Sequence, residues 1–198
     1  MASRREFMQH GFALSAAPFV LGPAVGVKAR MPRMRPALVV FDHQYLESRL
    51  FASALAARGF PTHGITGDVT SLWYYDLYHR WATGPSPIVG LTGASSLFCL
   101  EQLAWKVERR VVFRAEHNQL GNEQVEHRIT APEPATSVSG GSIEESWPLW
   151  SASAVQGVPA TLRRGVKFEG RAVGSVVSGS GAWEEPLVSW VIALKPGA

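Results

Sequence analysis

The sequence predicts an α/β fold, in which helices alternate with the strands of a parallel sheet. Two observations carry this prediction. Between residues 37 and 114, short apolar runs alternate with segments whose apolar residues recur at helical spacing. Glycine or proline stands near the ends of most of these segments. Since a continuously apolar strand is buried on both faces, and strand–helix–strand units build parallel sheets, we expect a small Rossmann-like (flavodoxin-like) sheet.

The first strand and helix follow from the apolar pattern. Residues 37–41 are continuously apolar and predict a buried strand that ends at Asp42. Apolar residues at helical spacing predict a helix over residues 45–58, and Gly59 stands where a helix C-cap is expected. A second short strand is expected over residues 61–66.

The pattern then repeats twice. A helix is expected to begin near Thr70, and a third strand follows at residues 87–91. The third helix carries the apolar residues of 97–104, and residues 110–114 predict a fourth strand. Residues 30–117 are therefore expected to form an α/β domain with right-handed crossovers.

After residue 117 the composition changes. Residues 118–142 are polar and rich in Pro, Ser and Gly, which predicts a loop with room for a short strand over 125–130. Residues 143–198 predict a β-rich C-terminal extension packed on the same domain, with a short helix over 143–155 that Pro148 interrupts. Its strands are expected at residues 160–168, 172–178 and 187–194. They either extend the sheet antiparallel or form a small appendage.

The composition limits the classes of protein and of site. Of the 198 residues, 46% are hydrophobic and 18% are charged, so the chain can bury a core and lacks the composition of a disordered protein. The single cysteine, Cys99, excludes an intramolecular disulfide and cysteine-rich zinc or iron–sulfur sites. Because Cys99 falls in an apolar helical pattern, we expect its side chain to be buried.

The N-terminus shows the features of an export signal in the usual order. Residues 3–8 read Ser-Arg-Arg-Glu-Phe-Met, a moderately apolar stretch follows over residues 11–27, and small residues precede a cleavage site after Ala29. Proline and glycine interrupt the apolar stretch, so it fits a signal peptide better than a stable membrane span. We therefore expect residues 1–29 to be a signal peptide.

This segment resembles a twin-arginine signal peptide, in which Arg4, Arg5 and Phe7 match the recognition pattern. The resemblance implies folding before export, passage through the twin-arginine translocase and residence in the periplasm, with no stable membrane insertion after cleavage. Cargo of this kind often holds a cofactor inserted in the cytoplasm or travels with a partner that does. A leader that is retained as an anchor is the alternative.

Charge argues against nucleic-acid binding. The formal net charge is +3, of which residues 1–29 contribute +2 through two arginines and one lysine against one glutamate. The mature chain is therefore near neutral, and it has no basic stripe with interleaved aromatic residues. No cofactor-binding motif is recognisable in the sequence, so we expect neither a nucleic-acid partner nor a cofactor.

Polar side chains follow the ends of the predicted strands, where open parallel sheets bind ligands. Asp42 follows the first strand and His117 the fourth, and both are candidate catalytic residues. The candidate ligand-binding residues are Asp68, Thr92, Gly93, Ser95 and Ser96. As a ligand site, the loop before residue 97 would offer backbone amides to a carboxylate or a phosphate. The structural alternative is that Asp42 and this loop are ordinary helix caps.

A Glu-His doublet occurs twice, at residues 116–117 and 126–127. Histidine and carboxylate ligands suit zinc or iron. Neighbouring residues on a strand point to opposite faces, however, so each doublet supplies one inward group, and the spacing fits no standard metal motif. We therefore expect no metal site.

Aromatic residues are concentrated in the second predicted helix. They outnumber the aromatic side chains that one helix face can bury. They are Trp73, Tyr74, Tyr75, Tyr78 and Trp81. Part of this set is expected in the core, and the rest is expected to line a ligand pocket or a protein interface.

Three functions fit these observations. The favoured one is an exported accessory protein or small non-catalytic subunit of a larger redox-enzyme complex, because the leader, the surplus aromatic residues and the lack of a cofactor motif agree with it. A small periplasmic enzyme (a hydrolase, isomerase or lyase) acting at the strand-end edge is the alternative. A ligand-binding module without turnover is the third.

Overall fold

The computed structural model describes residues 33–132, 141–143, 146–159 and 167–195, and they belong to one compact unit, Met31–Ala198. The proposed signal peptide, with Arg4, Arg5 and Phe7, lies outside the described residues. So does most of the strand expected at residues 160–168.

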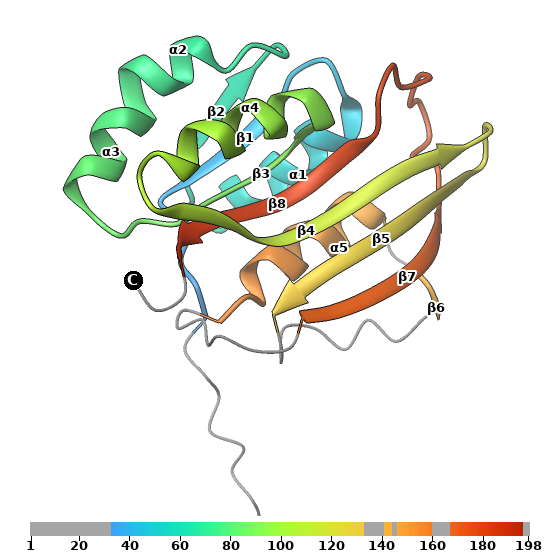
Figure 1. Ribbon diagram of the computed structural model, residues 1–198. Helices are drawn as coiled ribbons and strands as arrows, with labels where there is room; N and C mark the ends of the chain where they lie inside the picture. Colours follow the sequence, from blue (N-terminus) through green and yellow to red (C-terminus); the bar gives the residue numbers. More distant parts are fainter. Residues whose placement is uncertain (1–32, 133–140, 144–145, 160–166, 196–198) are drawn as a thin grey trace, which may run out of the picture. The chain divides into compact units, whose positions relative to one another are not determined.

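The described part of the chain forms one eight-stranded sheet, in the order β2-β1-β3-β8-β4-β5-β7-β6 (Figure 1). The strands are β1 (Leu38–Asp42), β2 (Thr62–Ile65), β3 (Ile88–Gly93), β4 (Arg109–Leu120), β5 (Gln124–Pro132), β6 (Gly141–Ser142), β7 (Lys167–Ser175) and β8 (Leu187–Leu194). The helical segments are α1 (Leu46–Ala56), α2 (Thr70–Leu72), η1 (Trp73–Leu77), α3 (Tyr78–Thr83), α4 (Ala94–Trp105) and α5 (Trp147–Gln156).

The α/β alternation expected for the first half is confirmed. Strand β1 pairs in parallel with β2 on one side and with β3 on the other. Helix α1 ends as predicted, since Gly59 adopts a φ of +84° and its N–H donates to the Ala56 carbonyl over 2.8 Å. The expected second helix is continuous from residue 70 to 83, but its middle turn, η1, is a π-helix.

The expectation of a parallel sheet is wrong beyond β3. Strand β8, from the C-terminal end of the chain, lies between β3 and β4 and is antiparallel to both. Strands β5 and β7 continue the sheet antiparallel, so it is mixed. Residues 187–194 were expected as a strand and form one, but they are not an appendage. Seven of the eight residues of β8 are buried, which explains why it occupies a central position.

The short strand expected over residues 125–130 is confirmed as part of β5, but the loop expected around it is wrong for the described residues. Strand β4 continues to Leu120, the chain turns at Gly121 with a φ of +68°, and β5 follows. Buried and more exposed residues alternate along β5, as in a strand with one face on the core. Apart from the buried His127, its polar residues belong to the outer face of the sheet rather than to a loop.

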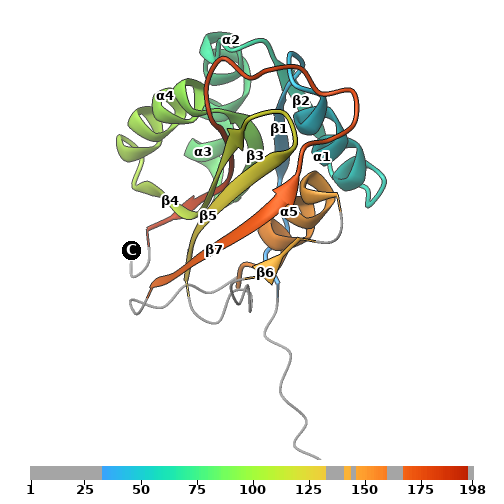
Figure 2. The same ribbon diagram turned by 90° about the vertical axis from the view of Figure 1, so that its right-hand side faces the viewer.

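Two apolar cores lie on opposite faces of the sheet. Helices α1 and α5 pack on one face, around Phe51, Phe113 and Trp147. The segment 70–83 and α4 pack on the other, around Leu72, Trp81 and Trp190. In Figure 1 the two sets lie on either side of the strands, and Figure 2 shows α5 against β5 and β7.

Two smaller expectations also change. Pro148 does not interrupt a helix, because it stands in the first turn of α5, where a missing N–H costs no hydrogen bond. Cys99 is exposed rather than buried, because α4 turns residues 96, 97 and 100 toward the sheet instead. No helix among the described residues is long and apolar enough to cross a membrane.

Candidate functional site

Asp42 ends β1 with its carboxylate buried and occupied by backbone donors. One oxygen accepts the N–H of Gln44 over 2.9 Å, and the other accepts the N–H of Gly67 over 3.0 Å. The backbone N–H of Asp42 donates to the Ser48 hydroxyl over 2.7 Å. The side chain therefore joins the end of β1 to the turn after β2, as a structural cap does.

Asp42 and His117 do not meet. Asp42 shares its strand face with Val40, in the core under α4, whereas His117 packs on Trp147 in the core under α5. Strands β3 and β8 also separate them, a distance of roughly 14 Å at about 4.8 Å per strand. These two residues cannot work as a direct acid–base pair.

Three other candidate residues also make structural hydrogen bonds. Thr92 is buried, and its hydroxyl accepts the indole N–H of Trp190 over 3.1 Å. The Ser96 hydroxyl donates to the Gly67 carbonyl over 2.7 Å. Asp68 accepts the N–H of Thr70 over 2.8 Å. Hydrogen bonding from the side chain of Thr70, followed by this backbone contact, lowers the pKa of the Asp68 carboxyl. The Ser96 contact thus joins the first turn of α4 to the turn after β2.

The carboxylate site expected at residues 92–96 is filled from within the chain. The N–H and the hydroxyl of Ser95 donate to the two carboxylate oxygens of Glu185, over 2.8 and 2.7 Å. A Cβ at Gly93 would lie 2.1 Å from one of these oxygens, so only glycine leaves room for the contact. Glu185 therefore supplies the anion that the N-terminus of α4 favours.

The two Glu-His doublets face each other across β4 and β5, as a cross-strand pair. The Nδ1 atoms of His117 and His127 are 2.7 Å apart, and Nε2 of His117 lies 3.0 Å from the Ser189 hydroxyl. Trp147 of α5 lies over His117, with ring centroids 4.2 Å apart. The expectation of one inward group per doublet is confirmed, because both histidines are buried and Glu116 and Glu126 pair with arginines on the outer face.

Burial keeps this histidine pair neutral. Desolvation, with the neighbouring imidazole second, holds the pKa of His117 well below its usual 6.5. Desolvation also lowers the pKa of His127, to about 4. Among the described residues no group of three or more His, Cys, Asp or Glu side chains is placed to hold a metal ion.

A buried carboxylate that the sequence did not reveal lies on the same side of the sheet. Glu47, in the first turn of α1, has no exposed surface, and one of its oxygens accepts the hydroxyl proton of Ser180. Its other oxygen has no partner among the described residues. An acidic residue in a first helical turn is ordinary, so its burial could not be read from the sequence. Glu47 is buried because the loop between β7 and β8 folds back over the start of α1.

Comparison of the chain with protein-family models, with curated proteins and with solved structures gives no match.

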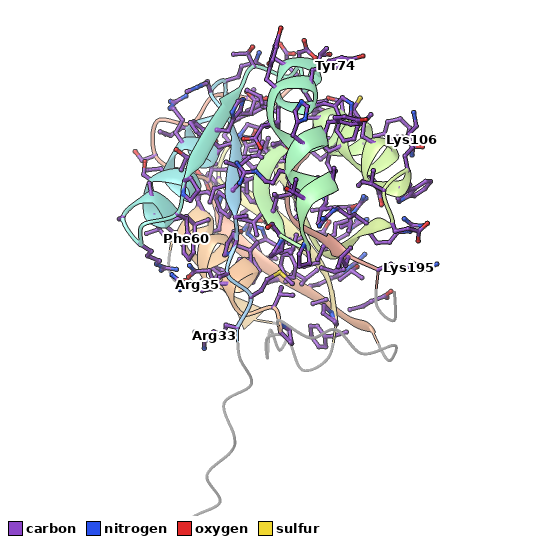
Figure 3. All side chains as sticks on the ribbon, turned by 90° about the vertical axis from the view of Figure 1, so that its left-hand side faces the viewer. Arg33, Arg35, Phe60, Tyr74, Lys106 and Lys195 are labelled. Atoms are coloured by element: carbon purple, nitrogen blue, oxygen red, sulfur yellow. The ribbon has the colours of Figure 1, made fainter. Side chains whose placement is uncertain are left out.

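The aromatic helix, residues 70–83, presents all three of its tyrosines to solvent. Tyr74, Tyr75 and Tyr78 are 65%, 86% and 55% exposed, whereas Trp81 is buried. The π-helical turn contains two of these tyrosines, and Figure 3 shows Tyr74 projecting from the outer side of this segment. The expected division of the aromatic set between core and surface is confirmed, and we call the three tyrosines the tyrosine surface.

Proposed function

We propose that the protein is an exported, non-catalytic accessory protein that docks onto a larger partner through its tyrosine surface. The observation that carries this proposal is the exposure of three tyrosines on one short helical segment. Tyrosine buries a large area with little loss of side-chain freedom, and it is enriched among the residues that dominate binding energy at protein interfaces. A cluster of exposed tyrosines is therefore better explained by a binding surface than by a chance arrangement.

The neighbouring helix adds apolar area on the same side of the sheet. Phe98 and Trp105 of α4 are 62% and 46% exposed, and α4 and the tyrosine helix belong to the same core layer. A π-helical turn inside the aromatic segment agrees with this proposal, since such turns are frequent at functional sites.

The state of the candidate catalytic residues favours a non-catalytic role. The Asp42 carboxylate already accepts backbone N–H groups of the same chain, and His117 is enclosed beneath Trp147. A general acid or base must reach its substrate, which neither residue can do in this arrangement. The enzyme hypothesis therefore has less support than docking.

The export signal sets the compartment in this proposal. The resemblance of residues 3–8 to a twin-arginine signal supports folding in the cytoplasm, passage through the twin-arginine translocase and residence in the periplasm. A redox enzyme is the favoured partner, because this route often carries cofactor-loaded complexes. For the fold, the order β2-β1-β3 supports a Rossmann-like (flavodoxin-like) origin of the parallel half alone.

Site-specific photo-cross-linking tests the docking surface. A benzophenone amino acid replaces Tyr75 in the full chain, which is expressed in its own host and irradiated in intact cells. The control places the same group at Leu120, which is 52% exposed in the β4–β5 turn. We expect one dominant adduct of defined mass from position 75 and none from position 120. Equal cross-linking at both positions, or none at either, contradicts the proposal.

A triple variant then connects the contact with assembly. The triple variant carries Tyr74→Ser, Tyr75→Ser and Tyr78→Ser. We expect that the protein cross-linked through position 75 no longer copurifies with this variant. Because the three side chains are exposed, the free energy of unfolding should change by no more than about 0.5 kcal/mol per site. A variant that still copurifies with the partner would exclude the tyrosine surface.

A further inference from the structure

A small cavity lies beside the buried carboxylate of Glu47, away from the tyrosine surface. Its volume is about 180 Å³; the start of α1 and the loop between β7 and β8 line it, and it opens to solvent. Its lining includes aromatic, acidic and hydroxyl side chains, which are Tyr45, Trp183, Glu47, Glu184 and Ser180. Pockets for drug-sized ligands hold roughly 300–1,000 Å³, so this one suits a molecule of only a few carbon atoms.

The first indication of a ligand is the unpartnered oxygen of Glu47. The side chain has no exposed surface, and Ser180 satisfies only one of its two carboxylate oxygens. A buried carboxylate oxygen without a donor is costly, and each such group in a native protein calls for a partner. A ligand N–H that donates to this oxygen would complete its hydrogen bonding.

The second indication is the sign of the charge around the cavity. Glu47 and Glu184 line it, and none of the residues that line it is Lys, Arg or His. Burial, followed by the negative charges of Glu185, Asp42 and Glu184, raises the pKa of the Tyr45 hydroxyl. The surroundings of Tyr45 are therefore negative, which favours a cationic ligand.

The third indication is the aromatic wall. Tyr45 and Trp183 both line the cavity, and the faces of such rings attract ammonium groups. Trp183 is held in place on three sides. Its backbone N–H donates to the Gln119 side chain over 3.2 Å, its indole N–H donates to the Ser180 hydroxyl over 3.3 Å, and its ring lies 5.8 Å from that of Trp147. This wall is preformed.

We propose that this cavity binds a small organic ammonium ion, whose N–H donates to Glu47 while its carbon chain packs against Trp183 and Tyr45. A primary alkylammonium fits best, because its three N–H groups match the free oxygen of Glu47, the Ser180 hydroxyl and Glu184, and its short chain matches the cavity volume. The site is independent of docking through the tyrosine surface.

Titration of the full-length protein with propylammonium tests the site. The readout is the indole N–H resonance of Trp183 in a proton–nitrogen NMR spectrum, assigned with a Trp183→Phe variant. We expect a saturable shift with propylammonium and none with propanol or propionate, which have similar size but lack the positive charge. Absence of a shift at tens of millimolar propylammonium, or an equal shift with propanol, overturns the proposal.

Matched variants separate the ammonium site from unspecific binding. Glu47→Gln should weaken the affinity for propylammonium by at least about tenfold. Glu123→Gln, in an exposed turn, should leave this affinity unchanged. If Glu47→Gln does not fold, Trp183→Leu should weaken binding several-fold and Trp105→Leu should not, with the shift of the Tyr45 amide as readout. Unchanged affinity in the folded Glu47→Gln protein, or in Trp183→Leu, overturns the proposal.

A blocked lysine identifies the source of the ammonium group. Nα-acetyl-lysine amide presents the same ammonium at the end of a polypeptide side chain. Tighter binding of this compound than of propylammonium supports a lysine from another polypeptide as the ligand, and weaker binding supports a free amine. Failure of both compounds to bind contradicts the site.

Discussion

At the scale of single residues, the contact of Glu185 with the start of α4 shows how a protein satisfies a helix N-terminus. The free amide of Ser95 needs an acceptor, and a negative charge there is favoured by the helix dipole. Glu185 comes from the loop just before β8, so this carboxylate connects residues 90 positions apart in the chain. The glycine at position 93 is what permits the close approach.

Removal of this carboxylate should destabilise the protein. Glu185→Ala leaves the Ser95 amide without its acceptor, and the loss of an N-terminal cap costs about 1 kcal/mol. Urea denaturation of the mature chain measures the effect. Glu184→Ala, one residue earlier and exposed, should stay within about 0.5 kcal/mol of wild type. Equal effects of the two substitutions would show that the cap contributes nothing.

At the scale of elements, Arg109 joins the start of β4 to the end of the aromatic helix. Its side chain is buried, and its guanidinium donates to the carbonyls of Ser86 and Trp81, over 3.1 and 3.4 Å, and to that of Gly84. The guanidinium carbon also lies 5.2 Å from the Trp81 ring centroid. Burial lowers the pKa of Arg109, yet a guanidinium stays charged in proteins. It therefore acts as the C-terminal cap of this helix.

Replacement of Arg109 tests this capping role. Arg109→Met keeps much of the apolar volume but leaves three carbonyls without donors, which should lower the free energy of unfolding by about 2–3 kcal/mol. Arg109→Lys should restore only part of it, because one ammonium cannot reach all three carbonyls in the guanidinium geometry. Arg110→Met is the control, since Arg110 contacts the Trp105 ring and, among the described residues, donates one hydrogen bond, to the neighbouring carbonyl of Arg109. A loss no larger than that of the control would contradict the role.

At the scale of the whole molecule, the sequence predicted where the strands and helices lie along the chain better than it predicted which strands pair. The strands and helices of residues 37–105 lie close to their expected positions, because apolar spacing reports which face of an element is buried. The insertion of β8 between β3 and β4 was missed, since spacing does not specify which strand pairs with which. The nearly continuous apolar run of β8 was the available signal for a central strand.

The candidate site shows the same limit, because sequence patterns do not reveal which distant residues come into contact. Alternation along the strands predicted that one residue of each Glu-His doublet faces inward, but it could not predict that His117 and His127 meet. Their pairing depends on the length of the turn at Gly121, which sets the register of β4 and β5. Glu47 was missed because only a loop 133 residues further along the chain buries it.

The histidine pair makes the stability of the whole molecule depend on pH. It lies where β4, β5 and β8 meet beneath α5, so it bears on the packing of four elements. When both rings are neutral, one Nδ1 donates and the other accepts across 2.7 Å, whereas two protonated rings would set two donors against each other. Burial disfavours a charge on either ring, so charging the pair opposes the folded state.

The sign of the pH effect follows from the lowered pKa values. The unfolded chain takes up protons on these histidines near pH 6.5, whereas folded His127 does so only near pH 4, and burial holds the pKa of folded His117 well below 6.5. Between these values the unfolded state binds more protons, so the free energy of unfolding should fall with decreasing pH by up to about 1.4 kcal/mol per pH unit for each histidine. Urea denaturation at a series of pH values from 7 to 4.5 measures this slope. His127→Asn, which cannot titrate, should flatten it by about half, while His79→Asn, at an exposed position, should leave it unchanged. If the wild-type and His127→Asn slopes are equal, His127 does not titrate differently in the folded and unfolded states.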